Sequence, residues 1–317
     1  MSKTTRFAPI LANLTIIAVI AASAAGEMAR PSPAQGAASA PVDNRPVAVP
    51  GSLQFGVYDP HADFSSDASV KIEHLFMPWQ DVDLATLAAA DVYARERGRS
   101  LLITVEPWSW SENKRIKSDA LLRGILAGHY DGNISAICGA ANKLQAPTTI
   151  RWAQEMEDTT GRFSWAGWAP ADYKATYRKF VDECRTVAHN VKFMWSPMGM
   201  PTLDKYYPGD DVVDSVGLTV FGLQKFDRDN FGRDRTFAEI LKPGYDIASR
   251  FDKPIYVAEL GYVGNRDYVR NWASSVLQRY PQFSKLAGIV YFDDKEISPW
   301  PGNYGLPNWR VTSNVVN

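Results

Sequence analysis

Apolar residues fall into two alternating patterns along the chain, namely short β-type runs and longer stretches with helical spacing. Strand-like runs are distinguished from helical stretches by length and by apolar period. The short runs predict eight strands, at residues 53–58, 70–76, 101–106, 148–153, 191–195, 215–220, 254–258 and 288–291. The longer stretches predict helices at 84–97, 120–126, 134–144, 170–188, 236–250 and 266–279.

This alternation predicts an α/β fold in which a parallel sheet is connected by crossover helices. Eight such units in about 265 residues favour a (β/α)₈ barrel, the TIM barrel, whose usual length is ~250 residues. The first strand is not followed by a Gly-rich phosphate-binding sequence, which disfavours a nucleotide-binding, doubly wound sheet. We therefore expect a single catalytic domain at residues 52–317.

The N-terminal segment has the pattern of an export signal. Residues 3–6 are basic, residues 7–22 are almost wholly apolar, and Ala22-Ser23-Ala24 offers small residues for cleavage. We predict a signal peptide at 1–24 and a disordered Ala/Pro/Ser-rich tether at 25–51, hence a secreted or periplasmic protein. A retained membrane anchor is the alternative, because the apolar run approaches the ~20 residues that span a bilayer.

Charge and metal-ligand chemistry exclude several classes of partner. The chain has 34 Lys and Arg against 35 Asp and Glu, so no charge excess favours nucleic acid or an anionic membrane. Cys138 and Cys184 match no metal or redox spacing and are interpreted as helix-packing residues, with a bridge possible but not required. The four His are scattered, so we predict no metal site and no cofactor, and no obligatory protein partner is evident.

Three glutamates end or follow predicted strands, where the active sites of such barrels are built. They are Glu106, Glu155 and Glu259. Alternation along a strand places Glu155 on one face with Arg151, and Glu259 on one face with Val257, so both carboxylates are expected over the barrel mouth. Glu106 precedes a proline and is expected at a structural or substrate-edge position.

A facing pair of carboxylates is what cleavage of a glycosidic bond requires. One carboxyl must protonate the leaving oxygen, so its pKa must be raised, while the other must stay ionised, for example beside Arg151. The alternative is that Glu155 and Glu259 are salt-bridged residues that merely close the barrel mouth.

Motifs along four strands carry a family resemblance. They are Ile-Arg-Trp-Ala-Gln-Glu-Met at 150–156, Trp-Ser-Pro at 195–197, Tyr-Tyr-Pro-Gly-Asp-Asp at 206–211 with Asp-Ser-Val-Gly-Leu at 214–218, and Lys-Pro-Ile-Tyr-Val-Ala-Glu-Leu-Gly at 253–261. Together they resemble glycoside hydrolase family 26 of clan A, which contains β-mannanases and some β-1,3-1,4-glucanases. The resemblance implies that Glu155 is the acid/base and Glu259 the nucleophile of a retaining mechanism, with carboxyls about 5 to 5.5 Å apart.

Two positions depart from the mannanases of that family. Gln154 stands where they have a histidine, and Phe221 stands where they have a tyrosine near the end of strand six. Gln154 can hydrogen-bond a sugar but cannot titrate, and Phe221 offers the nucleophile no hydroxyl. The sugar at the cleavage subsite therefore need not be mannose.

Aromatic residues near the strand ends complete the predicted substrate site, because sugar rings stack on such side chains. By the resemblance, Trp300 is the stacking ring beside the cleavage site. The predicted substrate-binding residues are Arg151, Gln154, Trp108, Trp165, Trp195, Phe221 and Trp300.

The sequence thus predicts an exported, retaining endo-β-glycosidase. Its substrate is a β-1,4-linked mannan or a β-glucan with 1,4 or mixed 1,3-1,4 linkages, including a polysaccharide that the cell itself makes. The alternative is a weakly active or inactive barrel that serves as a glycan-binding or polysaccharide-secretion accessory module. The two glutamates argue against this alternative, since a binder has no need to hold two carboxylates together.

Overall fold

Eight parallel strands close into a barrel in the order in which they occur along the chain, with β8 paired to β1. The structure is a computed structural model and describes residues 44–316. The strands are β1 (Gln54–Tyr58), β2 (Val70–Pro78), β3 (Ser100–Glu106), β4 (Thr148–Trp152), β5 (Val191–Trp195), β6 (Ser215–Leu223), β7 (Ile255–Val263) and β8 (Leu286–Phe292). All eight predicted strands and the (β/α)₈ fold are confirmed.

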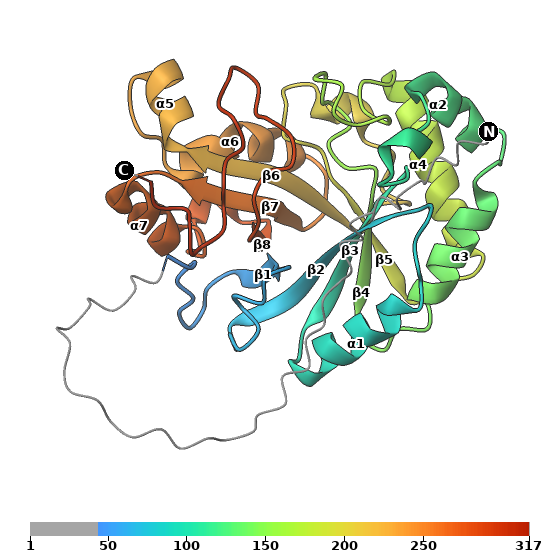
Figure 1. The fold of residues 1–317 in the computed structure, drawn as a ribbon, viewed down its shortest axis with the longest axis horizontal. Helices are drawn as coiled ribbons and strands as arrows, with labels where there is room; N and C mark the ends of the chain where they lie inside the picture. Colours follow the sequence, from blue (N-terminus) through green and yellow to red (C-terminus); the bar gives the residue numbers. More distant parts are fainter. Residues whose placement is uncertain (1–43, 317) are drawn as a thin grey trace, which may run out of the picture. The chain divides into compact units, whose positions relative to one another are not determined.

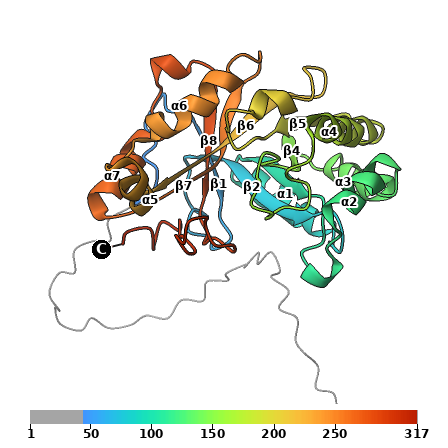
Figure 2. The ribbon, with the colours of Figure 1, turned by 90° about the horizontal axis from the view of Figure 1, so that it is seen from above.

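Helices α1–α4 cover one side of the barrel and α5–α7 the other (Figures 1 and 2). They are α1 (Thr86–Glu96), α2 (Ser118–Leu126), α3 (Asp131–Ala141), α4 (Pro170–Arg185), α5 (Gln224–Phe231), α6 (Phe237–Ala248) and α7 (Arg266–Ser275). Short 3₁₀ helices occupy Glu112–Lys114, Leu203–Tyr206 and Pro281–Phe283. The sequence did not predict α5, because this mostly polar helix follows β6 directly and has no long apolar stripe.

Local sequence signals explain where helices begin and end. Pro170 lies in the first turn of α4, where its missing N–H costs nothing. Thr236 and Glu239 form a capping box at the start of α6. Gly232 ends α5 in the left-handed conformation, with φ of 70°.

Two apolar layers lie on either side of the strands. Outside the barrel, Trp152 stacks on Phe180 of α4 with ring centroids 4.9 Å apart, as expected for a residue facing the helices. Inside, side chains from five strands meet, and these are Ile72, Leu102, Met194, Ala258 and Val290. Strands that are not neighbours can contact one another in this way only through the barrel interior, so this cluster identifies the inward-facing positions.

A disulfide joins Cys138 of α3 to Cys184 of α4, with Cα atoms 5.3 Å apart. The interpretation of these cysteines as ordinary packing residues was therefore wrong. The two helices lie side by side on the outside of the barrel (Figure 1). Because the cysteines are 46 positions apart in sequence, only the packing of the crossover helices brings them within bonding distance.

The end of the predicted tether contacts the barrel. The Val47 amide donates to the Ala273 carbonyl at 2.8 Å, and the Asn44 amide group donates to the Val311 carbonyl at 3.1 Å. The packed part of the chain therefore includes residues from Asn44 onward, earlier than the predicted boundary at residue 52. The predicted signal peptide, its membrane-anchor alternative and most of the tether lie outside the described residues. Between residues 44 and 316, none of the helices is both long enough and apolar enough to cross a bilayer.

Candidate active site

A β-bulge turns Glu259 toward the barrel interior. Along β6 and β7, Leu218 pairs with Val257 but Thr219 pairs with Glu259, so Ala258 is the extra residue, and the β7–β8 register also shifts here. Ala258 belongs to the inner cluster, whereas Val257 packs in the outer core. Simple alternation with Val257 would have pointed Glu259 outward, so the expected position was right but the reasoning from alternation was wrong. Bulges beside active sites re-aim side chains in this way.

Arg151 holds the carboxylate of Glu259 in a buried ion pair. Its Nη1 lies 2.6 Å from Glu259 Oε1, and the Arg151 side chain is completely buried. Arg151 also donates to Ser196 Oγ at 2.8 Å and to Thr104 Oγ1 at 3.3 Å. The predicted cation beside the nucleophile position is therefore present. With no exposed surface, however, Arg151 positions Glu259 and is not available as the predicted substrate contact.

The segment that carries Glu155 leaves β4 in a strained backbone conformation. Ala153 and Glu155 have φ of 48° and 56°, a region that residues with a Cβ rarely adopt. Long-range hydrogen bonds hold it there: the Glu155 amide donates to the Ser196 carbonyl at 2.8 Å, and Trp165 Nε1 donates to the Gln154 carbonyl at 2.7 Å. Strain that neighbouring structure maintains is characteristic of functional sites.

Glu155 lies in surroundings that favour the neutral form of its carboxyl, whereas Glu259 is paired with the guanidinium of Arg151. Burial raises the pKa of Glu155, and the negative charge of Glu259 raises it further; the charges of Arg162 and Arg151 and the hydrogen bond from Thr219 oppose this rise. Thr219 Oγ1 donates to Glu155 Oε1 at 2.6 Å. One carboxyl thus favours its protonated form, while the other is paired with a buried guanidinium. Two carboxyls in such contrasting environments suit an acid and a nucleophile.

Glu106, at the end of β3, is a third buried carboxylate beside this pair. Its Oε2 accepts hydrogen bonds from Trp108 Nε1 at 3.0 Å and Trp110 Nε1 at 2.7 Å. Its Oε1 accepts from Gln154 Nε2 at 3.2 Å. Gln154, predicted to contact substrate, is almost completely buried, and its Oε1 has no hydrogen-bond partner in the described part of the chain.

Two of the predicted stacking rings belong to the core. Trp195 follows the inward-facing Met194, so it points outward and packs edge-on against Tyr207 and Phe251. Trp165 is completely buried and stacks on Phe163 with ring centroids 4.7 Å apart. Neither ring offers a face to a sugar, which corrects their expected roles.

Trp108 is also buried, but it belongs to the wall of the site. One face of its ring is covered by the guanidinium of Arg115, 3.9 Å from the ring centroid, and its edge packs on Trp165. Trp108 therefore supports the neighbouring residues and has little surface left for a substrate.

Phe221 and Trp300 lie together, half-buried, on the β6–β8 side. Phe221 lies two residues beyond Thr219 on the same face of β6, and its ring packs at 4.6 Å from Trp309 and 5.9 Å from Trp300. A Cβ on Gly261 would meet both Phe221 and Trp309 at 2.8 Å, so this aromatic packing requires glycine there. The structure thus brings Phe221 and Trp300 together beside the strand that carries Glu259.

Several residues that shape the site are absent from the predicted catalytic and substrate-binding residues. Glu296 accepts hydrogen bonds from Trp300 Nε1 at 3.3 Å and Trp309 Nε1 at 3.1 Å, and it pairs with Arg162 at 3.2 Å. The charge of Arg162 and the hydrogen bond from Thr219 both lower the pKa of Glu155. Thr219 could have been found from its inward position on β6, whereas Arg162, Glu296 and Trp309 lie in loops that no periodicity describes.

Three acidic residues at the ends of β1 and β8, Asp59, Asp63 and Asp293, are close enough together to hold a cation. Arg310 already pairs with Asp63 at 2.6 Å. Burial raises the pKa of Asp293 to about 8, and the neighbouring carboxyls of Asp63 and Asp59 add to this rise. Arg310 therefore supplies one positive charge to this cluster.

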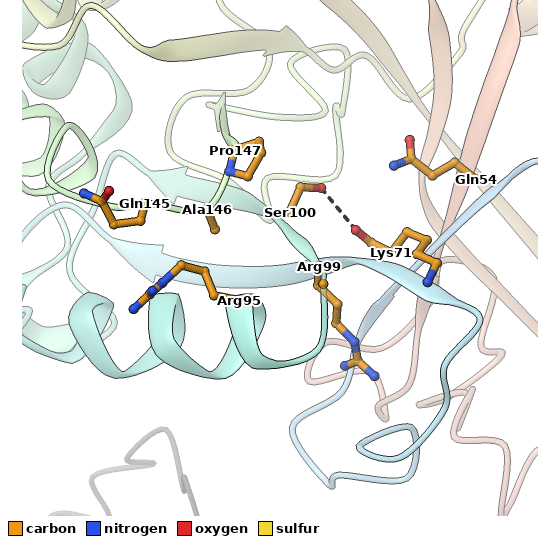
Figure 3. Close-up of a pocket in the computed structure, with 9 residues that line it drawn as sticks. Gln54, Lys71, Arg95, Arg99, Ser100, Gln145, Ala146 and Pro147 are labelled. Carbon is orange, nitrogen blue, oxygen red and sulfur yellow. Dashed lines mark hydrogen bonds between the residues drawn. The ribbon is translucent and has the colours of Figure 1, made fainter.

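A cavity of about 480 Å³ lies at the opposite end of the barrel (Figure 3). Gln54, Lys71, Ser100 and Pro147, which line it, lie at or just before the starts of β1 to β4. In Figure 3, Ser100 donates to the backbone carbonyl of Lys71, at 3.2 Å. The N-terminal face of such barrels serves stability, so the candidate active site remains at the other end.

A closed (β/α)₈ barrel with two carboxyls in contrasting environments at its C-terminal face is an arrangement typical of glycosidases. Residues 123–246 match the family model described as Glycosyl hydrolase family 26. This match, which includes Glu155 and ends before Glu259, confirms the resemblance to glycoside hydrolase family 26.

Two curated relatives are β-1,3-xylanases. The one from Alcaligenes sp is 28% identical over 116 residues, covering 34% of this chain and 24% of that protein. The one from Vibrio sp is 30% identical over 110 residues, covering 32% of this chain and 23% of that protein. The matched segment thus spans about a quarter of the length of these relatives.

Solved structures of family 26 mannanases share the fold. A β-mannanase from Bacteroides ovatus superimposes with a TM-score of 0.59 at 19% identity, covering 76% of this chain and 80% of that one. An endo-β-1,4-mannanase from Cellulomonas fimi gives 0.62 at 17% identity, covering 80% and 68%. At these identities the likeness establishes the fold alone.

Proposed function

We propose that this protein is a retaining endo-β-glycosidase in which Glu155 is the acid/base and Glu259 the nucleophile. The observation that carries the proposal is the contrast between the two carboxyls. Burial and the charge of Glu259 raise the pKa of Glu155, whereas Arg151 lies 2.6 Å from Glu259. A salt-bridged pair that only closed the barrel mouth would have no need for this difference between the two carboxyls.

In the first step, Glu259 attacks the anomeric carbon while the bond to the leaving oxygen breaks, and Glu155 gives its proton to that oxygen. The ion pair with Arg151 holds the carboxylate of Glu259 in place for attack. When the glycosyl-enzyme ester forms, the negative charge of Glu259 is lost, so the repulsion that raised the pKa of Glu155 is removed. Glu155 is then suited to take a proton from the water that attacks the ester and releases Glu259.

The proposed substrate is a β-linked polysaccharide. The motifs favour a β-1,4-mannan or a β-glucan, and the names of the curated relatives add β-1,3-xylan to the candidates. Gln154 and Phe221 replace two residues of the mannanase pattern, so a backbone other than mannan is compatible with this site. Incubation of the protein with β-1,4-mannan, mixed-linkage β-glucan, soluble cellulose and β-1,3-xylan, followed by sizing of the products, identifies the backbone and distinguishes internal from terminal cleavage.

The test of the catalytic roles is the variant Glu259→Gln, which keeps the shape of the side chain but removes the nucleophile. We expect almost complete loss of hydrolysis with retained binding of a long glycan. Glu96→Gln, on the exposed face of α1, is the matched control and should leave both unchanged. Proton NMR of the first product of the unaltered protein should show the β-anomer. Unchanged turnover in Glu259→Gln would refute the assignment, and glycan binding by an inactive wild type would support the accessory-module alternative.

We also propose that the protein is exported. The disulfide between Cys138 and Cys184 supports this proposal, because such bonds persist mainly in oxidising compartments. Mass measurement of the protein recovered outside the cytoplasm should give an N-terminus near residue 25. Recovery in a membrane fraction with residues 1–24 attached would favour the anchor.

A further inference from the structure

Glu296, in the segment that follows β8, is a buried carboxylate that holds three side chains of the candidate site. Its Oε1 accepts hydrogen bonds from Trp300 Nε1 at 3.3 Å and from Trp309 Nε1 at 3.1 Å. Its Oε2 lies 3.2 Å from Nη2 of Arg162. Only 4% of the Glu296 side chain is exposed, so water and salt compete little for these contacts.

The ion pair between Arg162 and Glu296 joins opposite sides of the barrel. Arg162 lies in the loop after β4, and Glu296 follows β8, which is four strands away in either direction around the closed sheet. Burial lowers the pKa of Arg162, but four negative charges raise it by more. They belong to Glu296, Glu155, Glu259 and Glu106. Because these carboxylates come from different sides of the barrel, the guanidinium that interacts with all of them lies over the barrel mouth.

Arg162 therefore has other carboxyls within its reach besides that of Glu296. Its side chain is long, and 32% of it is exposed, so it can change direction without disturbing the core. Glu259 already has Arg151 as its partner. Between residues 44 and 316, however, Glu155 forms no ion pair. If Glu296 did not hold the guanidinium of Arg162, Glu155 would attract it, because an arginine pairs strongly with a carboxylate.

A direct pair with Arg162 would disable Glu155 as an acid. Burial raises the pKa of Glu155, and the charge of Glu259 in β7 raises it further. Three groups lower it, namely the charges of Arg162 and Arg151 and the hydrogen bond from Thr219 in β6. A guanidinium in contact with Glu155 would lower this pKa much more, because an adjacent opposite charge favours the ionised form. Glu155 would then have no proton to give to the leaving oxygen.

Resting on the function proposed above, we infer that Glu296 is a positioning residue for hydrolysis, whose buried carboxylate holds the guanidinium of Arg162 away from the acid/base Glu155. The other oxygen of the same carboxylate fixes the indole of Trp300. One side chain thus connects the aromatic ring expected to stack on the sugar with the group that protonates the leaving oxygen.

The variant Glu296→Gln tests this inference, because it breaks the ion pair and keeps an oxygen for the two indoles. Its NH₂ group, in place of Oε2, cannot pair with a guanidinium. For the polysaccharide that the unaltered protein cleaves best, we expect kcat/KM at neutral pH to fall at least about tenfold, since general acid catalysis contributes ~10²–10⁴-fold. The basic limb of the pH profile should move to lower pH, because Glu155 loses its proton more readily.

An aryl β-glycoside of the same sugar, with an activated phenol as its leaving group, is the companion substrate. Its leaving oxygen needs little protonation, so kcat/KM for this substrate should change by no more than about threefold in Glu296→Gln. The control Glu96→Gln should leave both substrates unaffected, and thermal unfolding of each variant checks the fold.

Removal of the arginine as well should restore the lost activity. In the double variant Arg162→Gln/Glu296→Gln no guanidinium is left to pair with Glu155, so kcat/KM for the polysaccharide should return to within about threefold of the unaltered protein. Arg162→Gln alone should move the basic limb to higher pH, because one of the charges that lower the pKa of Glu155 is gone. This single variant, at a partly exposed position, keeps the test decisive if Glu296→Gln fails to fold.

A loss in Glu296→Gln that the double variant does not restore would overturn the inference and leave Glu296 with a purely structural role. An unchanged pH profile in Arg162→Gln would also overturn it. Failure of the unaltered protein to cleave any glycan or aryl glycoside would instead refute the proposed function itself.

Discussion

Replacing Arg151 by Gln should disable the protein while leaving its fold intact. Arg151 is completely buried, and its Nη1 is 2.6 Å from Glu259. A glutamine can still hydrogen-bond Ser196 or Thr104, but it removes the positive charge. Glu259 would then be a carboxylate near Glu155 without its ion-pair partner.

The size of the effect follows from the burial of the pair. Removing one partner of a buried ion pair costs about 3–5 kcal/mol. If the active state bears this cost, and each 1.36 kcal/mol is a factor of ten, kcat/KM should fall by roughly two to four orders of magnitude. The loss should be present across the pH range of activity, because an arginine stays charged at every pH in that range.

The assay is the pH profile of kcat/KM for Arg151→Gln, measured beside a matched control. Arg178→Gln breaks an exposed ion pair with Asp211 and should change neither rate nor profile, since such surface pairs contribute little. Thermal unfolding of each variant checks the fold. An Arg151→Gln variant with the rate of the unaltered protein would refute the idea that this ion pair is needed for attack by Glu259.

Three further predictions concern other parts of the molecule. Replacing both Cys138 and Cys184 by Ala should lower the free energy of unfolding by up to about 4 kcal/mol, from the loop entropy of a 46-residue separation, and a loss below about 1 kcal/mol in urea titration would contradict this. Trp300→Ala should weaken productive substrate binding by about 1 to 3 kcal/mol, seen as a higher KM, whereas an unchanged KM would place Trp300 in the core alone. The pKa of Asp293 in the folded protein is about 8, above its unfolded value, so the native state binds more protons and stability falls as pH rises from about 4 to 8. Asp293→Asn should lose less stability between pH 5 and pH 8 than the unaltered protein does, and equal slopes in denaturant unfolding would exclude this role.

Strand positions could be predicted well because buried parallel strands are short apolar runs, and all eight occur where the pattern placed them. The orientation of side chains was less predictable. Trp195 was expected at the rim, but alternation after the inward-facing Met194 turns it outward. The bulge at Ala258 could not be read from residue types, because alanine fits either face of a strand.

Contacts between loops were the least predictable part of the site. The ion pair of Arg162 with Glu296 joins residues 134 positions apart, in segments with no apolar period. The disulfide was missed for a similar reason, since the approach of α3 to α4 depends on how the crossover helices pack. Glu259 lies in β7 and Glu155 lies just after β4, so the strand pattern placed both near the barrel mouth, although alternation gave the wrong reason for the direction of Glu259.

The extra residue in β7 makes the direction of Glu259 depend on the bulge as well as on its place in the sequence. Deleting Ala258 would place Glu259 directly after Val257 and opposite Thr219, so the strand would pair without a bulge and the carboxylate would still face the barrel interior. A related sequence that lacks one residue at this point can therefore keep an inward-facing glutamate. When relatives of this barrel are screened for activity, a glutamate one position closer to the Lys-Pro turn at 253–254 is thus still a candidate nucleophile.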